Sequence, residues 1–336
     1  MPADHMTTVE IIETAAAKVI TGTPLADAAT AAGMQASALA DAVEVYRQAG
    51  RRAVHTRANP GWWQVYVQFL DWNEAERAVA EHLAPLLQRA EADGVVAAWW
   101  FMRKHPCWRL RLRPGPAGRA MREDLSAELD QLTTGGKISG WWPGIYEAET
   151  AAFGGNPGMD IAHDLFCADS RAIVSMVRSD ETTLGRRELS LLLCGTLMHA
   201  ANLEWYEQGD VWHRVTQERP HLTDVPPNKI TALADEVRSM LLTDTAPGGP
   251  LLGENGPLAS AAGWAEAFRR TGHALGAAAR EGILRRGLRE IISYLVIFHW
   301  NRLGLHVRTQ SILASAARAA ILETSTSPAS VQGDDH

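Results

Sequence analysis

Strand-type and helix-type patterns alternate in a fixed order between residues 63 and 147. Four segments are rich in valine, aromatic and other strand-favouring residues: 63–69, 95–103, 107–113 and 137–147. Two further segments, 73–94 and 117–132, repeat apolar residues at helical spacing. The order strand–helix–strand–strand–helix–strand is that of the split βαβ, or ferredoxin-like, arrangement. It predicts a four-stranded antiparallel sheet with helices on one face.

Only helices are predicted after Gly158, over residues 158–176, 186–206, 228–242, 259–280, 286–303 and 308–322. The first fifty residues also predict short helices, and the last two of these form a helix-turn-helix pair around Gly33. The fold class is therefore α+β. We expect a helical N-terminal extension, a split βαβ sheet module, a helical subdomain and a disordered tail, over residues 1–58, 59–157, 158–322 and 323–336.

Charge and composition argue against several classes of protein. A net charge of −7 argues against a general nucleic-acid binder, and the second helix of the N-terminal pair carries a single basic residue, Arg47. The most apolar stretch, residues 292–298, is far too short to span a membrane, and the N-terminus lacks a signal pattern. Three scattered cysteines favour a reducing compartment. We expect a cytoplasmic protein without nucleic-acid or membrane partners.

The segment from Trp108 to Arg113 places unlike side chains on its two faces. Leu110 and Leu112 point one way, and every second residue, which is an arginine, points the other way: Arg109, Arg111 and Arg113. These guanidinium groups repel one another unless anions meet them. They form either a solvated face paired with glutamates or a strip that binds an anion or an acidic peptide. If helices cover the leucine face, the strip faces the helical subdomain.

A second polar region runs from Tyr146 to Ser170. It contains the carboxylates Glu147 and Glu149 and forced turns at Gly154-Gly155 and Gly158. Such a run is costly for a core and useful for a site. Asp160 and His163 have the spacing of metal ligands, but no third ligand is placed to join them, so no metal site is expected.

A third polar group lies in an otherwise apolar helix near the end of the chain. His299, Asn301 and Arg302 follow Ser293 and Tyr294 there, and burying them is expensive without partners. His299 is either a satisfied core histidine or a site residue, and the same two interpretations apply to His199. Nucleotide-binding loops and hydrolase motifs are absent from the sequence, so no cofactor is expected.

Three segments together resemble one known family over residues 62–322. They are the block 146–170, WWFMRKHPCWRLRLR (99–113) and HWNRL (299–303), and they resemble the thiopeptide-type lantibiotic dehydratase C-terminal family. The resemblance implies action on a ribosomally made precursor peptide. One group in this family eliminates glutamate from glutamylated serine or threonine to give dehydroamino acids. The other, the pyridine synthases, joins two dehydroalanines in a formal aza-[4+2] cycloaddition, loses water and expels the leader peptide.

One position separates these two activities. Eliminating members carry Glu-x-x-Arg-Tyr-Gly-Gly, and the matching residues here run from Glu149 to Gly155 with Ala152 at the arginine position. Elimination needs a cation to hold the leaving glutamate, so this loss favours a pyridine synthase. Arg109 and Arg111 do match the family's arginine strand, so glutamate elimination stays an alternative. A non-catalytic scaffold that binds a leader peptide is the second alternative.

The resemblance also implies roles for the polar residues. By type and location, Tyr294, Ser293, His299 and Tyr146 are the candidate catalytic residues. The candidate substrate-binding residues are Arg109, Arg111, Arg113, Glu147, Glu149, His199, Asn301 and Arg302. The expected partner is a precursor peptide with an acidic leader and a core that contains azoles and dehydroalanines. The twelve tryptophans either fill the core or stack on such flat groups. The oligomeric state stays open.

Overall fold

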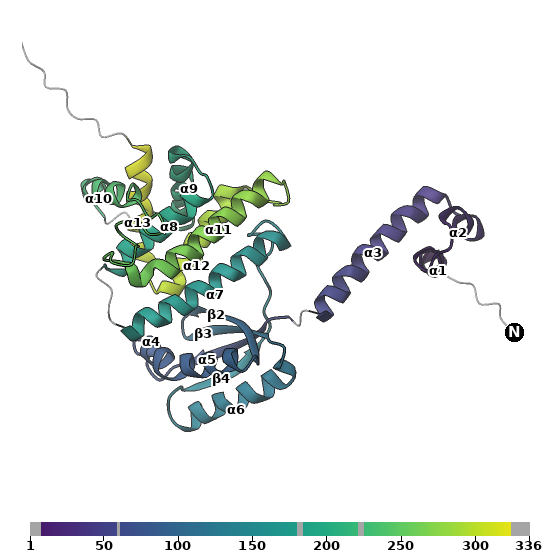
Figure 1. Cartoon of the computed structure of the whole chain (residues 1–336), viewed down its shortest axis with the longest axis horizontal. Coiled ribbons are helices and arrows are strands. Elements are labelled where there is room, and N and C mark those ends of the chain that lie inside the picture. Colours follow the sequence, from purple (N-terminus) through teal and green to yellow (C-terminus); the bar gives the residue numbers. More distant parts are fainter. Residues whose placement is uncertain (1–7, 59–60, 180–183, 221–224, 324–336) are drawn as a thin grey trace, which may run out of the picture. The chain divides into compact units, whose positions relative to one another are not determined.

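The structure, a computed structural model, describes residues 8–58, 61–179, 184–220 and 225–323. The chain divides into two compact units, residues 1–61 and 62–336 (Figure 1). The predicted disordered tail lies outside the described residues except for Glu323. The predicted boundary between the sheet module and the helical subdomain stays a prediction.

The first unit consists of three helices: α1 (Thr8–Ile20), α2 (Leu25–Ala31) and α3 (Ala36–Ala58). They bury a small core of alanines together with Leu39 and Val43. Gly33 has a φ of +65° in the turn between α2 and α3, a left-handed conformation that glycine adopts without strain. The sequence predicted that the last helix would end near Gly50, whereas α3 continues to Ala58.

The second unit begins with the predicted sheet. Its strands are β1 (Trp63–Gln68), β2 (Val96–Lys104), β3 (Cys107–Pro114) and β4 (Gly140–Gly144). They are ordered β2-β3-β1-β4, and every neighbouring pair is antiparallel. In the register, Val65 of β1 lies opposite Leu110 of β3 and Pro143 of β4. This order is that of the split βαβ arrangement, and it confirms the predicted α+β fold class.

Helices of the sheet module cover the leucine face of the sheet. A continuous helical stretch consists of α4 (Ala75–Ala78), one π-helical turn η1 (Val79–Leu83) and α5 (Ala84–Ala92). A 3-10 turn η2 (Gly118–Ala120) leads into α6 (Met121–Thr134). Trp141 lies on the leucine face, and its Nε1 donates to Asp130 of α6 at 2.9 Å. The leucine side chains of this face are buried, as the alternating pattern predicted.

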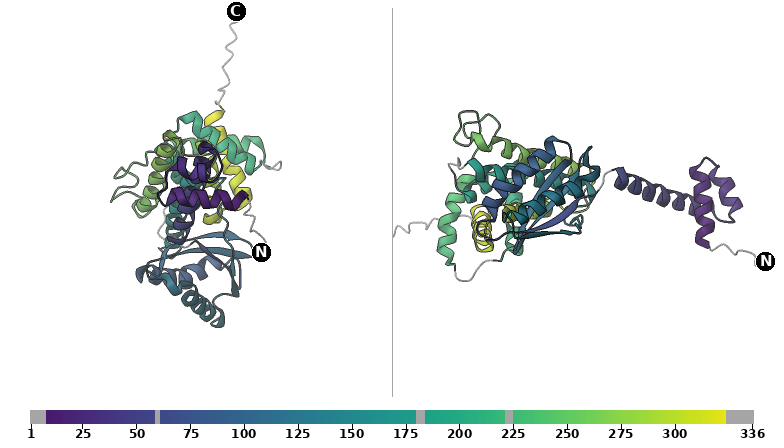
Figure 2. Two further views of the ribbon diagram at one scale, coloured as in Figure 1. Left: turned by 90° about the vertical axis from the view of Figure 1, so that its right-hand side faces the viewer. Right: turned by 90° about the horizontal axis from the view of Figure 1, so that it is seen from below.

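Helix α7 (Asn156–Ser179) lies between the sheet and the helices that follow α7 in the sequence (Figures 1 and 2). It runs beside β2, one of the two edge strands of the sheet, and the hydroxyl of Ser170 accepts a hydrogen bond from the backbone amide of Phe101 at 3.2 Å. An unpaired edge amide is satisfied in this way. The arginine face therefore meets α7, as the sequence predicted for the side opposite the leucines.

The remaining helices are α8 (Arg186–Ala200), α9 (Trp205–Glu218), α10 (Pro227–Leu241), α11 (Ala262–Arg280, after a 3-10 turn η3 at Ala259–Ala261), α12 (Leu288–Leu303) and α13 (Val307–Leu322). The prediction of one helix over 186–206 was wrong. Asn202 has a φ of +63°, which ends α8, and a capping box between Glu204 and Glu207 begins α9. No helix of the described residues is long and apolar enough to cross a membrane.

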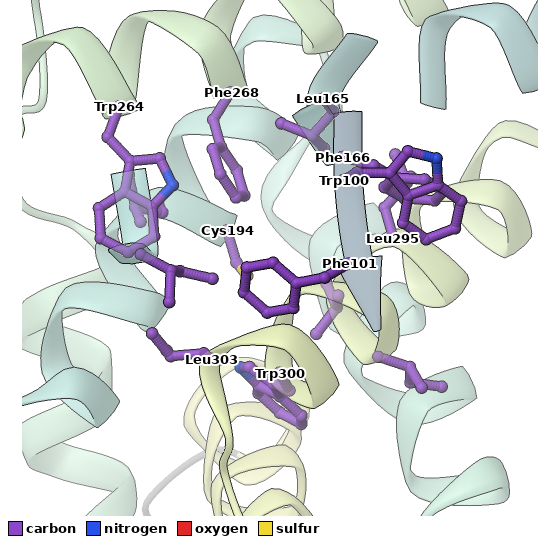
Figure 3. Packing of buried hydrophobic residues seen from close by; sticks show 14 of the residues in the cluster. Trp100, Phe101, Leu165, Phe166, Cys194, Trp264, Phe268, Leu295, Trp300 and Leu303 are labelled. Atoms are coloured by element: carbon purple, nitrogen blue, oxygen red, sulfur yellow. The ribbon is translucent and has the colours of Figure 1, made fainter. Parts of the chain in front are cut away.

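Aromatic side chains fill much of the core of the second unit (Figure 3). Trp212 stacks on Trp300 with ring centroids 5.8 Å apart, and the indole nitrogen of Trp300 donates to Ser190 at 2.6 Å. Seven of the twelve tryptophans are buried. The core interpretation therefore accounts for most of them, whereas Trp142 is exposed and Trp62 is half-buried.

Candidate functional site

Arg111 is the central residue of the arginine strip and is buried, with 3% of its surface exposed. Its Nε donates to the side-chain oxygen of Gln64 on β1 at 2.9 Å. The guanidinium lies 4.1 Å from the ring centroid of Trp100 and 4.9 Å from that of Tyr146. Burial lowers the pKa of Arg111 to about 10. One of its terminal nitrogens, Nη1, has no hydrogen-bond partner among the described residues.

The two outer arginines of the strip meet aromatic rings. Arg109 is half-buried and lies 5.5 Å from the ring of Tyr66, which stacks on Trp142. Arg113 is exposed and lies 5.6 Å from the ring of Trp62. The three arginines share one face, as predicted. They lie against aromatic rings and do not converge on a shared carboxylate of the described residues.

Tyr146 and His163 form a hydrogen-bonded pair beside Arg111. The phenol oxygen lies 2.8 Å from Nε2 of His163, which is on α7. Burial, together with the positive charges of Arg113 and Arg111, lowers the pKa of His163 to about 4. Burial also raises the pKa of Tyr146. Both groups are therefore neutral near pH 7, and the phenol donates to the imidazole.

A second buried cluster surrounds Asp169 of α7, which has no exposed surface. Its carboxylate accepts from Nδ1 of His299 at 2.9 Å, from Nε of Arg302 at 2.7 Å and from the indole nitrogen of Trp264 at 2.8 Å. Burial alone would raise the pKa of Asp169, but His299 and Arg302 hold it below its usual value. The late helix thus uses its predicted site residues to bind this carboxylate.

Arg302 connects this cluster to the arginine strip. Its guanidinium lies 4.3 Å from the ring of Phe166, and Phe166 packs against Trp100 at 4.8 Å. Figure 3 shows the Trp100 and Phe166 side chains close together. Arg111 lies over the Trp100 ring of this pair. The two terminal nitrogens of Arg302 and Nε2 of His299 have no hydrogen-bond partner among the described residues. The buried N–H groups of Arg302 suit a negatively polarised oxygen.

Ser293 and Tyr294 form hydrogen bonds with other partners than His299 does. Ser293 is buried, and its hydroxyl donates to the carbonyl of Glu290 in its own helix at 2.7 Å. The hydroxyl of Tyr294 donates to Glu218 of α9 at 3.4 Å. Within the described residues, no hydrogen bond, ion pair or ring contact joins Tyr294 to His299.

Tyr294 is nevertheless linked to the glycine-rich block. The guanidinium of Arg286 lies 5.2 Å from the Tyr294 ring and donates to the carbonyl of Ala151 at 3.3 Å. The same guanidinium forms an ion pair with Glu290. Arg286 therefore lies beside the position where eliminating relatives carry arginine, but a carboxylate already binds it.

The other predicted binding residues occupy varied environments. Glu147 and Glu149 are exposed, and the charge of Glu149 acts on both Arg111 and Tyr146. His199 is exposed at the end of α8, and the side-chain oxygen of Asn301 accepts from Gln310 at 3.0 Å.

Of the two turns predicted in the block, the one at Gly154-Gly155 is present, with φ values of +79° and +99°. The prediction of a turn at Gly158 was wrong, because this glycine lies in the first turn of α7. No cluster of three or more potential metal ligands occurs in the part of the chain that the structure describes.

His163 and Asp169 were missing from the predicted site residues. The sequence suggests His163 only as one of two residues with metal-ligand spacing. Asp169 lies within the polar region from Tyr146 to Ser170 but has no predicted role. Their importance comes from contacts with residues far away in the sequence: Asp169 binds Arg302, 133 positions later. The sequence does contain one local signal for both residues. Each is a polar residue at a position where the helical repeat of apolar residues predicts a buried side chain.

Comparisons with known proteins agree with this fold. A family model described as lantibiotic biosynthesis dehydratase C-term matches residues 62–321. The tRNA-dependent lantibiotic dehydratase MibB from Microbispora sp. 107891 is 20% identical, with a TM-score of 0.54, over 77% of this chain and 28% of that chain. The chain thus spans about a quarter of that enzyme's length.

Two further solved structures are similar. TsrL is 15% identical with a TM-score of 0.50, over 77% of this chain and 94% of that chain. The pyridine synthase TbtD from thiomuracin biosynthesis is 13% identical with a TM-score of 0.48, over 77% and 97%. No curated protein matched the chain. Since the family model covers most of the chain and includes the sheet, the arginine strand and the late helix, the protein belongs to the lantibiotic biosynthesis dehydratase C-terminal family.

Proposed function

We propose that this protein joins two dehydroalanines of a modified precursor peptide by a formal aza-[4+2] cycloaddition. Loss of water and of the leader peptide then gives a pyridine-centred macrocycle. The observation that carries the proposal is Ala152, within a retained Glu149 and Gly154-Gly155 pattern, where eliminating members carry arginine. The nearby Arg286 is paired with Glu290 and is not free to hold a leaving glutamate.

The geometry around Tyr146 supports this chemistry. Cycloaddition is accelerated chiefly by holding diene and dienophile together, and it needs a neutral donor for the iminol tautomer of the amide. The Tyr146 phenol has a raised pKa, so it remains protonated at neutral pH. Its single O–H is donated to His163, so donation to the amide requires the phenol to exchange His163 for the substrate as its partner. The Arg111 charge lies over its ring. The half-buried Tyr66 and exposed Trp142 provide a nearby stacking surface for flat azoles.

Tyr294 is the second proposed acid, with His299 and Ser293 as neighbours in the helix. Its support is the contact of the Tyr294 ring with Arg286, whose guanidinium donates to the carbonyl of Ala151 in the glycine-rich block. The proposed substrate-binding residues keep their roles: Arg109, Arg111, Arg113, Glu147, Glu149, His199, Asn301 and Arg302. A cytoplasmic setting and the absence of a cofactor remain part of the proposal.

The decisive test is mass spectrometry of a linear peptide that bears two dehydroalanines and its leader. The purified protein should release the leader and form the pyridine macrocycle. Tyr294→Phe and Tyr146→Phe should each slow the reaction by roughly 10²–10⁴-fold, the usual loss for a general acid. The exposed Tyr206→Phe is the matched control and should retain full activity.

Two other outcomes identify the alternatives. If the enzyme ignores the dehydroalanine peptide but converts glutamylated serine to dehydroalanine, it is an elimination enzyme and the proposal fails. If it binds the leader but converts neither peptide, it is a non-catalytic scaffold.

A further inference from the structure

A cavity of about 460 Å³ lies beside the edge strand β2, between this strand and the helices α7 and α11. Ala97 and Ala98 of β2 and Arg113 of β3 form one wall, and residues of α7 and α11 form the others. It is distinct from the buried Tyr146–His163 pair and from the Asp169 cluster, because none of those residues lines it.

The charges of this cavity are mostly positive. Arg113, Arg171 and Arg270 line it, and Asp164 is the single carboxylate among the lining residues. Arg171 already forms an ion pair with Glu91. Within the described residues, Arg113 and Arg270 form no ion pair with a carboxylate, and both are exposed. The chain as a whole carries a net charge of −7, so this concentration of unpaired cations is local.

The uncharged part of the lining consists of alanines together with Ile161, Cys167 and Thr271. Alanines of β2, α7 and α11 make up much of the wall: Ala97, Ala98, Ala168, Ala267 and Ala274. Burial raises the pKa of the Cys167 thiol to about 12, so it stays protonated and is no nucleophile. Small side chains let a peptide backbone approach closely. The cavity therefore has the character of a binding site and not of a reaction centre.

The edge strand offers backbone groups to such a peptide. The pairing of β2 with β3 shifts register between Val96 and Ala98, which leaves Ala97 out of the ladder and exposed. An edge strand with unpaired backbone groups can pair with an added peptide segment. Acidic side chains on that segment would reach Arg113 and Arg270.

We infer that this cavity binds an acidic peptide segment, with carboxylates on Arg113 and Arg270 and backbone beside Ala97. The inference rests on the proposed function only in assigning that segment to the precursor peptide. Arg113 is two residues from Arg111, roughly 7 Å along the strand, so a segment held here would tether the substrate next to Tyr146. The tether would raise the local concentration of the reacting part.

Fluorescence anisotropy of the full chain tests this binding. The probe is a fluorescein-labelled peptide with several glutamates, and its glutamine counterpart is the control ligand. The acidic peptide should bind, and rising salt should weaken it. Arg113→Glu and Arg270→Glu should each weaken it by roughly tenfold or more, the value of a charged hydrogen bond. Arg122→Glu, an exposed arginine on α6, is the matched control and should bind normally.

A second variant avoids any loss of arginine packing. Ala274 is exposed on α11 and lines the cavity, so Ala274→Glu adds a repelling carboxylate and should weaken binding to a similar degree. Equal binding of the glutamine peptide, or equal loss in Arg122→Glu, would overturn the inference. A further outcome would also overturn the inference. It is displacement of the acidic peptide by millimolar glutarate or phosphate, added at the same total negative charge as the peptide, because this would identify a site for small anions.

Binding and turnover separate the two proposals. An intact acidic-peptide affinity without pyridine formation would leave this inference standing and remove the proposed function. If pyridine formation is unchanged in Arg113→Glu, Arg270→Glu and Ala274→Glu, the proposed function stands and this inference fails.

Discussion

His163 should make the stability of the protein depend on pH. Its imidazole is 8% exposed, and its pKa falls from 6.5 to about 4 because of burial and the charges of Arg113 and Arg111. Between these two pH values the unfolded chain binds a proton at this histidine and the folded chain does not. Stability is therefore fully present above about pH 6.5 and is lost as the pH falls toward 4.

The size of this effect follows from the shift. A change of about 2.5 pH units, from 6.5 to 4, at roughly 1.36 kcal/mol per unit, gives about 3 kcal/mol. His163→Gln removes the titrating group and keeps an oxygen that accepts from Tyr146. The variant should lose most of this pH dependence, although the lost ring packing against Trp62 lowers its stability at every pH.

Urea unfolding of wild type and variant at several pH values from 4.5 to 7 provides the measurement. The difference in unfolding free energy between the two proteins should shrink as the pH falls. His273→Gln, which changes an exposed imidazole on α11, is the matched control for removal of one histidine. A difference that stays constant across this range would refute the buried neutral pair.

Three further changes test the packing around the site. Phe166→Ala, which removes a fully buried ring stacked on Phe298 at 5.2 Å, should lower the unfolding free energy by about 3–5 kcal/mol in urea. Asp169→Asn leaves the buried Arg302 charge uncompensated and should cost roughly 3–5 kcal/mol; an unchanged midpoint would contradict the cluster. Gly154→Ala forces a left-handed alanine at φ +79° and should lower the thermal midpoint, with a cost of roughly 1–3 kcal/mol, whereas the exposed Gly50→Ala should not.

The sheet could be predicted from the sequence because its signals are local. Alternation of Leu110 and Leu112 with the three arginines fixes both the strand and its two faces. The helices after Gly158 were also identified by period. The missed boundary at Asn202 shows where this reasoning ends: the apolar residues Leu203 and Trp205 continue across the break, and only the left-handed Asn202 and the Glu204–Glu207 capping box mark it.

The candidate site could be predicted in part. The arginine strand, the glycine-rich block and the late helix were recognised, but their pairing depends on tertiary contacts. The partner of Tyr146 is His163 on the following helix, and the partner of His299 is Asp169, 130 residues earlier. Sequence spacing carries no information on such pairs. Tyr294 and His299 are five residues apart in the helix. Positions with this spacing do not share a helix face, so the two side chains bind different partners.

Asp169 accounts for the polar residues His299 and Arg302 in the largely apolar helix α12. A single carboxylate on α7 binds Trp264 on α11 and both His299 and Arg302 on α12, so it fixes the positions of three helices. Apolar side chains would serve that purpose at least as well, because a buried ion pair adds little net stability.

What apolar side chains cannot supply is a buried cation beside Phe166 with further N–H groups still available. Arg302 keeps two such nitrogens, and Arg111, which lies over the Trp100 ring, keeps one. Holding these donors in place before substrate arrives is the condition for electrostatic stabilisation of an amide oxygen or a leaving group. Under the proposed function, the Asp169 cluster would support the reaction site in addition to its contacts in the core.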